Sequence, residues 1–331
     1  MTRPRLIVLT RVSPTAVAPL AGLLVLCCSL IGPAPVSAAE EPPRFEVPVA
    51  DGERPLTFVV YGDTRFTQRK SVANTVARHS LVDKIAHENP LAIFIGGDLV
   101  YQGSDAADYE TYKSETAQWT DQKIAVFPAL GNHEFKGCEH DPDPCLENWW
   151  NALAPQALRP YRWYSVTLGS TLLALVLDSD LALKPKSPQR VWLERQIDQV
   201  DPGVRFIVIV LHYPPVRDPI YPRARDEREV ARYLAGRAKS LQAQVVVVGS
   251  HVHNYERFHR DGVTYLVSGG GGANPVPAFR MFGELSRLTT SVNFHYLRFV
   301  LEPDRLTGTM VRLDVGDRSW SEPDHFEIRT R

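Results

Sequence analysis

Uninterrupted apolar runs recur along most of the chain. They are rich in Val, Ile and Leu and show little alternation of apolar and polar residues, which is typical of strands that are buried on both faces of a sheet. We therefore expect strands at Leu56–Tyr61, Leu91–Ile95, Ile124–Leu130, Thr171–Leu177, Val204–Leu211, Ala243–Val248 and Val263–Val267.

Segments with a helical spacing of apolar residues lie between several of these runs. The spacing predicts helices around 72–85 and 191–200, the second behind Pro188, a residue type favoured in the first helical turn. Weaker patterns predict helices at Tyr109–Trp119, Glu147–Leu158 and Glu227–Leu241. The tail is expected to form antiparallel strands at Phe294–Leu301, Thr307–Leu313 and His325–Ile328. Alternating strands and helices predict one α/β domain.

The composition agrees with one large globular domain. The chain has 331 residues, of which 44% are hydrophobic and 23% are charged, so it can bury a substantial core. The alternating pattern begins at Leu56. The proline-containing stretch 39–55 before it is expected to be an extended lead-in.

The first residues have the pattern of a secretory signal peptide. Three arginines precede a mostly apolar stretch at 16–31, and small residues follow it. We expect residues 1–38 to be the signal peptide, with cleavage after Ala38 or Ala39, and the mature protein to be secreted, periplasmic or extracellular. A retained membrane anchor is the alternative, but the apolar run is short and contains Pro19. A lipid-modified Cys27 is disfavoured by the bulky residue before it.

Removal of this leader leaves the chain weakly acidic. The leader contains three arginines and no acids, so Lys+Arg falls from 37 to 34 while Asp+Glu stays at 38. No basic excess remains that would predict a nucleic acid or an acidic membrane surface as a partner.

Two cysteines remain after the leader is removed, Cys138 and Cys145. They are close in sequence and would enter an oxidising compartment, which predicts a disulfide between them. The alternatives are two free thiols or half of a zinc site, and the chain has no second cysteine pair to complete such a site.

Acidic, amide and imidazole side chains follow five of the predicted strands. In chain order they are Asp63, then Asp98 and Tyr101, then Asn132, His133 and Glu134, then His212, and finally His251 and His253. Open α/β folds bind ligands at the carboxyl ends of their strands. Carboxylates and imidazoles suit metal cations, and so many donors are more than one ion needs. The pattern therefore favours a pair of ions that activates water for attack on a phosphoester.

These residues stand in motifs that resemble a known family. GD at 62–63, GDLVY at 97–101, GNHE at 131–134, His212 and HVHNYER at 251–257 resemble the calcineurin-like metallophosphoesterases, and GDxxY and HVHxYER resemble their purple acid phosphatase branch. The match spans Leu56 to about Gly272. It implies a four-layer α/β/β/α sandwich of two mixed sheets with helices outside, and makes 56–331 the catalytic domain.

The resemblance also implies roles for the individual residues. One ion is expected to be bound by Asp63, Asp98, Tyr101 and His253, and the second by Asp98, Asn132, His212 and His251. Asp98 would bridge the ions, and the hydroxide between them would attack phosphorus. His133 is expected to be the general acid, with Glu134 orienting it; a purely orienting role for His133 is the alternative.

Tyr101 bears on the identity of the metals. A phenol has a pKa near 10, so it is a poor ligand for a divalent ion but a good one for Fe(III). We therefore expect Fe(III) on the Asp63 side and a divalent ion (Zn, Mn or Fe) on the Asn132 side. The alternative is two Mn or two Zn ions, with Tyr101 packed as an aromatic wall.

The sequence departs from the family pattern at two positions. Many relatives carry a histidine two residues after the first Asp, where this chain has Arg65, and Ser250 replaces a glycine. Substrate contacts are expected from Arg65, Tyr213 and Arg217, because an arginine can hold phosphate oxygens; the alternative is a solvated loop. The run 269–272 is expected to be a tight backbone crossing or a phosphate cradle, and Asp178 a structural turn residue.

Together these features predict an exported dimetal hydrolase of phosphate monoesters, similar to an acid phosphatase. Its partner would be a small phosphoester, with no nucleic acid and, after signal cleavage, no membrane. One alternative is a phosphodiesterase or nucleotidase on the same site. Another is an inactive, metal-stabilised binding module.

Overall fold

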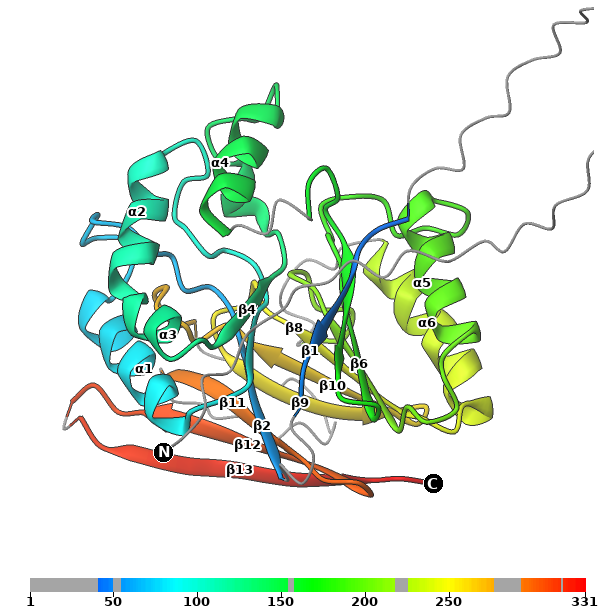
Figure 1. The fold of residues 1–331 in the computed structure, drawn as a ribbon. Helices are drawn as coiled ribbons and strands as arrows, with labels where there is room; N and C mark the ends of the chain where they lie inside the picture. The colour runs from blue at the N-terminus through cyan, green and yellow to red at the C-terminus, as the bar shows by residue number, and fades with distance from the viewer. Residues whose placement is uncertain (1–40, 50–54, 154–157, 218–225, 277–292, 317) are drawn as a thin grey trace, which may run out of the picture.

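The computed structural model describes residues 41–49, 55–153, 158–217, 226–276, 293–316 and 318–331 (Figure 1). The expected signal peptide lies outside these ranges, as do residues 154–157 of the helix expected at 147–158.

Two mixed sheets form the centre of the domain. The seven-stranded sheet has the order β1-β5-β6-β7-β8-β10-β9, and the six-stranded sheet has the order β13-β12-β11-β2-β3-β4. The strands are β1 Arg44–Val47, β2 Leu56–Tyr61, β3 Ala92–Ile95, β4 Ala125–Pro128, β5 Tyr164–Leu168, β6 Leu172–Val176, β7 Phe206–Val210, β8 Gln244–Gly249, β9 Tyr255–Arg260, β10 Val263–Ser268, β11 Phe294–Leu301, β12 Arg305–Leu313 and β13 Trp320–Arg329.

Helices cover the outer faces of both sheets. They are α1 Thr75–Glu88, α2 Ala106–Glu115, α3 Ala117–Asp121, α4 Asp143–Leu153, α5 Pro188–Asp198 and α6 Glu227–Arg237, with short 3₁₀ helices η1 Asn132–Phe135 and η2 Ala238–Ser240. In Figure 1, α1 to α4 lie on the left and α5 and α6 on the right, with the sheets between them. Helix α5 begins at Pro188, as the sequence predicts.

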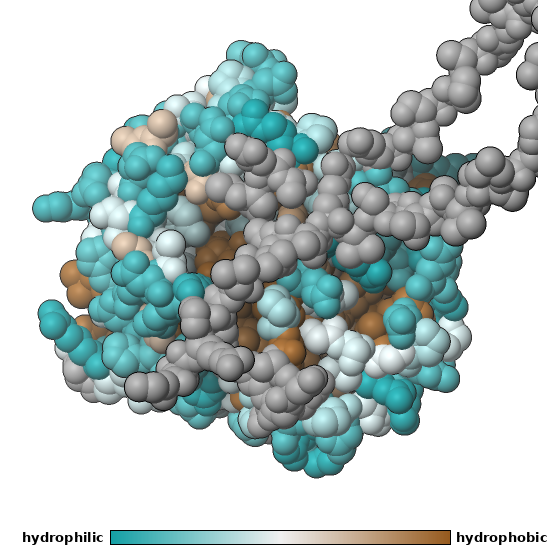
Figure 2. Space-filling model, viewed as in Figure 1, coloured by the Kyte–Doolittle hydropathy of each residue, from teal (hydrophilic) through white to brown (hydrophobic). Residues whose placement is uncertain are grey.

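Alternate residues of the central strands enter two different cores. In β6, Leu172, Ala174 and Val176 belong to the core between the sheets, while Leu173 and Leu175 pack under α5 and α6 in the second core. Every residue of β6 and β7 is buried, so the absence of polar alternation in these runs is explained. In the view of Figure 2, hydrophobic residues lie mainly in the middle of the visible face of the molecule, and hydrophilic residues flank them. The expected four-layer sandwich is confirmed.

Three strands lie in the sheets where the sequence pattern predicts none: β1, β5 and β9. Strand β1 falls in the expected lead-in and pairs with β5. Strand β9 pairs antiparallel with β10 at a sheet edge. An edge strand needs less apolar surface than a central one. This explains why the charged sequence YERFHR of β9 carries no strand signal. The three tail strands are confirmed and pair antiparallel.

Parallel pairing brings the strand ends that carry polar residues together. Strands β2, β3 and β4 are mutually parallel in one sheet, and β6, β7 and β8 in the other. Their carboxyl ends therefore lie at a common edge of each sheet. The loops after β2, β3, β4, β7 and β8 carry every residue expected to bind metal.

A disulfide joins Cys138 and Cys145, as expected, with a Cα–Cα distance of 6.1 Å. It closes the loop between η1 and α4. Within the described ranges, no helix combines the length and the apolar character needed to cross a bilayer.

Candidate metal centre

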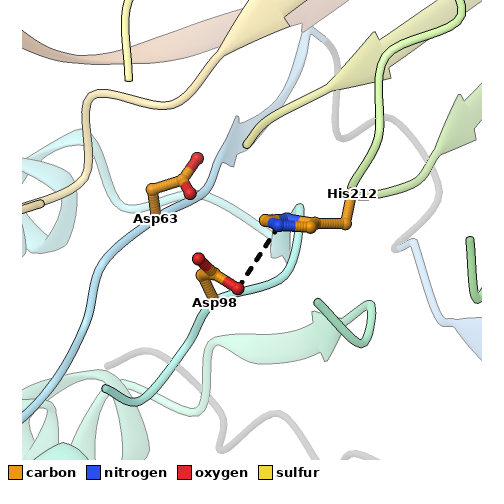
Figure 3. A group of neighbouring side chains, drawn as sticks. All are labelled: Asp63, Asp98 and His212. Atoms are coloured by element: carbon orange, nitrogen blue, oxygen red, sulfur yellow. Dashed lines mark ion pairs between the residues drawn. The ribbon is translucent and has the colours of Figure 1, made fainter. Parts of the chain in front are cut away.

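Two buried aspartates stand at the ends of β2 and β3. Asp63 and Asp98 are both fully buried, and both adopt left-handed backbone conformations, with φ of 56° and 52°. Such φ values are uncommon for residues other than glycine and are often found at functional sites. With His212 they form a group whose potential ligand atoms all lie within 4.8 Å of one another (Figure 3).

Small residues make this close approach feasible. A Cβ atom on Gly97 would lie 2.7 Å from Nδ1 of His212, and one on Gly131 would lie 2.6 Å from Oδ1 of Asp98. Ser250, the departure from the family pattern, fills space left by Gly62 and Gly96, whose added Cβ atoms would lie 2.2 and 2.3 Å from its hydroxyl oxygen. The serine is therefore accommodated without opening the site.

Lone pairs converge on the side of the site that carries Asn132. Nδ1 of His212 lies 2.9 Å from the carbonyl oxygen of Gly96, so Nδ1 carries a ring hydrogen, and in the neutral form of the ring Nε2 presents a lone pair. This lone pair faces Oδ1 of Asn132 at 3.1 Å and Oδ1 of Asp98 at 3.3 Å. Nδ1 of His251 lies 3.2 Å from the same nitrogen. Burial and His212 lower the pKa of His251 to about 4, which keeps this ring neutral.

These separations match the spacing of ligands around one ion. Ligands at bond lengths of about 2.1 Å are about 3.0 Å apart at adjacent octahedral positions and about 3.4 Å apart at tetrahedral ones. The distances from His212 to Asn132, Asp98 and His251 are 3.1, 3.3 and 3.2 Å. Two oxygen atoms and a second imidazole nitrogen therefore surround Nε2 of His212 at ligand spacing, and this side of the site can hold a cation.

The side that carries Asp63 is arranged differently. Oδ2 of Asp63 accepts the backbone N–H of His251 at 2.7 Å, and Oδ1 lies 3.4 Å from Nε2 of His253. The guanidinium of Arg65 also enters this side. Its Nη2 lies 3.2 Å from Nε2 of His253 and 3.5 Å from Oδ2 of Asp98.

Neighbouring groups favour the ionised form of Asp98. Burial by itself would raise the pKa of Asp98, but the imidazolium forms of His212 and His133, the charge of Arg65 and the backbone N–H of His133 outweigh it and hold this pKa well below its usual range. Asp98 is therefore the anionic centre of the site.

Tyr101 lies at the edge of the site, where its side chain contacts two cations. Its phenol is hydrogen-bonded with Lys136, which lowers its pKa, and the Lys136 ammonium lies 3.6 Å from the ring centroid. The guanidinium of Arg69 lies near the same ring, at 5.4 Å. The phenol thus faces two cations at the edge of the site.

His133 lies beside the site with one nitrogen fixed. Nδ1 contacts the carbonyl oxygen of Tyr101 at 2.5 Å, so this nitrogen carries a hydrogen. Nε2 lies 3.8 Å from Oδ2 of Asp98. Burial lowers the pKa of His133, partly offset by the charge of Asp98. Nε2 is the atom that can exchange a proton with a bound ligand.

Glu134 makes contacts that differ from the expected orientation of His133. Its carboxylate accepts three backbone N–H groups, from Asp98 at 2.9 Å, Val100 at 3.2 Å and Gly131 at 2.6 Å. Burial and the charge of Asp98 raise its pKa well above the usual value. Glu134 therefore holds the two loops that present the site, and acts on His133 only through the backbone.

The other expected substrate contacts lie around the histidines. The ring of Tyr213 packs 4.6 Å from that of His251, and its hydroxyl donates to Asp180 at 3.4 Å. Arg217 is largely buried, and its charge acts on His251. The run 269–272 is a tight backbone crossing: the N–H of Gly271 donates to the carbonyl of Gly62 at 2.9 Å.

A cavity of about 530 Å³ opens beside Asn132 and His133, and it contains residues that the sequence pattern did not single out. Its lining includes Phe135, Lys136, Arg162, Asp180 and Leu181. Asp180 follows a predicted strand and had the same signal as the other site residues. Arg162 precedes the unpredicted strand β5 and had none. Asp178 accepts from Arg162 at 2.5 Å and from the backbone of Asp180, as expected of a structural residue.

Several solved structures share this fold. Purple acid phosphatase PPD1 from yellow lupin matches with a TM-score of 0.67 and 17% identity over 88% of this chain, which spans 56% of the lupin chain. A dimetal phosphatase from Danio rerio matches with a TM-score of 0.57 and 13% identity, covering 84% of this chain and 100% of the other. GAP50, described as the anchor in the inner membrane complex of Plasmodium, matches with a TM-score of 0.59 and 17% identity, covering 83% and 89%.

The match of the sequence to a family model is stronger evidence for a family assignment than the similarity to these distant structures. The family model for calcineurin-like phosphoesterases matches residues 56–255. This match spans most of the chain and contains every residue expected to bind metal. The chain therefore belongs to the calcineurin-like phosphoesterase family.

Proposed function

We propose that this protein is an exported, metal-dependent hydrolase of phosphate monoesters, similar to an acid phosphatase. The observation that carries the proposal is the approach of three side chains to Nε2 of His212: Oδ1 of Asn132 at 3.1 Å, Oδ1 of Asp98 at 3.3 Å and Nδ1 of His251 at 3.2 Å. The buried carboxylate of Asp63 lies beside Asp98 and His212 in the same group. Membership of a phosphoesterase family gives this arrangement its chemistry.

The residues of the Asn132 side fit a divalent ion. A carboxylate, an amide oxygen and imidazoles suit Zn, Mn or Fe(II). A bound cation of this kind lowers the pKa of water and offsets the charge that develops on a phosphoryl group. The family and the dimetal phosphatase neighbour imply a second ion on the Asp63 side. The contacts of Arg65 and Tyr101 do not fit that ion, so the proposal does not rest on Fe(III).

The surrounding residues supply binding and proton transfer. Lys136 and Arg162 line the cavity beside His133, and their charges suit the dianion of a phosphate monoester. Nε2 of His133 can donate a proton to the leaving-group oxygen, because Tyr101 holds Nδ1 in place. The apolar lining from Phe135 and Leu181 can contact the alcohol portion of the ester.

Two other functions are tested by the same experiment. A diesterase or nucleotidase would use the same residues on a larger ester. A binding module without catalysis is the second alternative; one neighbour of this fold, GAP50, is described as an anchor. The presence of Asp98, Asn132 and His212 together beside His133 favours hydrolysis over binding alone.

The test is turnover of p-nitrophenyl phosphate and of bis(p-nitrophenyl) phosphate by the same preparation. The protein is stripped with a chelator and reloaded with Zn²⁺ or Mn²⁺. We expect rapid release of nitrophenolate from the monoester, slow release from the diester, and none from the stripped protein or from Asp98→Asn. Faster turnover of the diester would favour the diesterase. Absence of turnover in protein that retains metal would favour the binding module.

Export is a separate part of the proposal. The disulfide between Cys138 and Cys145 supports an oxidising compartment. N-terminal sequencing of protein recovered outside the cytoplasm should give a chain that begins at Ala39 or Glu40.

A further inference from the structure

Arg65 places a permanent positive charge inside the site. Only 16% of its side chain is exposed, and Nη2 lies between Nε2 of His253 at 3.2 Å and Oδ2 of Asp98 at 3.5 Å. These are two of the atoms that a second ion on the Asp63 side would need as ligands.

We propose that the guanidinium of Arg65 takes the place of that second ion, so that the site binds a single divalent metal on the Asn132 side. The inference rests on the proposed metal-dependent function and deepens it. Arg65 then acts as a built-in cation next to the one exchangeable ion.

The contact with His253 has the polarity that this role requires. Nδ1 of His253 lies 2.8 Å from the carbonyl oxygen of Asn274, so it carries the ring hydrogen. In the neutral ring, Nε2 presents a lone pair toward Arg65, which can only donate. The same lone pair cannot serve a metal ion while it accepts from Arg65.

The backbone of Arg65 is held in the conformation that directs the side chain inward. Its φ is 48°, in the left-handed region that is unfavourable for a long side chain. Its N–H donates to the carbonyl of Asp98 at 3.0 Å, and its own carbonyl accepts from Arg78 at 2.9 Å. Arg78 is in turn fixed by Glu115 at 2.6 Å. The position of Arg65 is thus determined by the fold around it.

Arg65 and a second ion would compete for the same ligand atoms. The guanidinium of Arg65 contacts Nε2 of His253 and Oδ2 of Asp98, which that ion would need. The Asn132 side is different, because Oδ1 of Asn132 and the other oxygen of Asp98 face Nε2 of His212 there. One ion on that side is also within reach of Asp63, since ligands on opposite sides of an ion are separated by about twice the bond length and the Asp63, Asp98 and His212 atoms lie within 4.8 Å.

The test is the metal stoichiometry of the full chain, which needs no activity. Stripped protein is dialysed against Mn²⁺, and bound metal per chain is measured by plasma mass spectrometry. Electron paramagnetic resonance then distinguishes an isolated Mn²⁺ from a coupled pair. We expect one uncoupled ion in the wild type. Two ions with a coupled spectrum are expected in Arg65→His, which offers a lone pair instead of a charge.

A second variant guards against misfolding, and a third serves as a matched control. Arg65→Gly removes the cation and suits the positive φ, so it should also bind two ions. Arg232→His changes an arginine that pairs with Glu229 on the exposed surface of α6, and should keep one. Two ions in the wild type, or one ion in both folded Arg65 variants, would overturn the inference while leaving the metal-dependent function intact. A wild type that binds no metal would overturn both.

Discussion

Asp98 and Glu134 hold each other's loops in place. The carboxylate of Glu134 accepts the backbone N–H of Asp98 at 2.9 Å, and the carboxylate of Asp98 accepts the backbone N–H of His133 at 3.0 Å. Each acid therefore fixes the segment that carries the other. Because both are buried, the pair determines where the anionic centre and the proton donor stand.

Glu134→Ala should loosen the metal centre without touching a metal ligand. It leaves three backbone N–H groups without their acceptor, and each unpaired buried group costs about 1–3 kcal/mol. We expect a lower free energy of unfolding and weaker Mn²⁺ binding, measured by urea denaturation and calorimetry. Glu110→Gln, on the exposed face of α2, should change neither. Unchanged metal affinity in folded Glu134→Ala would show that Glu134 does not position the site.

His133→Gln should keep its metal and lose rate. Loss of a general acid typically costs 10²–10⁴-fold. Phenyl phosphate, whose leaving group needs a proton, should lose about the upper end of this range, and p-nitrophenyl phosphate should lose much less. The measurement is kcat for both esters, with metal content as the control. Equal losses for the two esters would leave His133 with an orienting role only.

His295 should contribute a pH-dependent stability on the acid side. This fully buried ring contacts Asn293 at 2.7 Å, and burial lowers its pKa to about 3, below the unfolded value of 6.5. The unfolded chain binds the proton more readily, so stability is full above pH 6.5 and falls as the pH drops from about 6.5 to 3. Urea unfolding of His295→Gln between pH 7 and pH 4 should show a shallower loss. His87→Gln, at an exposed position of α1, should follow the wild type.

Reduction of the disulfide should destabilise the protein modestly. Cys138 and Cys145 are separated by seven positions, and such a short loop gives about 2–3 kcal/mol of stabilisation. Urea unfolding with and without a reductant measures this difference directly. Cys138→Ser/Cys145→Ser should match the reduced wild type and be insensitive to reductant. Two alkylatable thiols in protein isolated from an oxidising compartment would contradict the disulfide.

The central strands and the order of site residues could be predicted from the sequence because one physical cause produces both. Buried parallel strands are uninterrupted apolar runs, and their carboxyl ends must meet at one edge. Strand β2 was predicted with its observed bounds, Leu56–Tyr61. The residues after β2, β3, β4, β7 and β8 duly lie together.

The directions of individual side chains could not be predicted in this way. A motif places Tyr101 and Arg65 near the site, but both side chains are long and their direction depends on neighbours far away in sequence. Lys136 provides the partner of the phenol, and His253 the partner of the guanidinium. Glu134 likewise finds its partners on the loop after β3, which no local pattern reveals.

The candidate metal site lies on the seam between the two sheets. Asp98 and Asn132 follow strands of the six-stranded sheet, while His212 and His251 follow strands of the seven-stranded one. An ion bound by all four would cross-link the halves of the sandwich, so the sheets could not separate without releasing it. The lifetime of the protein against proteolysis would then depend on the free metal concentration, so that scarcity of metal would shorten its survival as well as limit its activity.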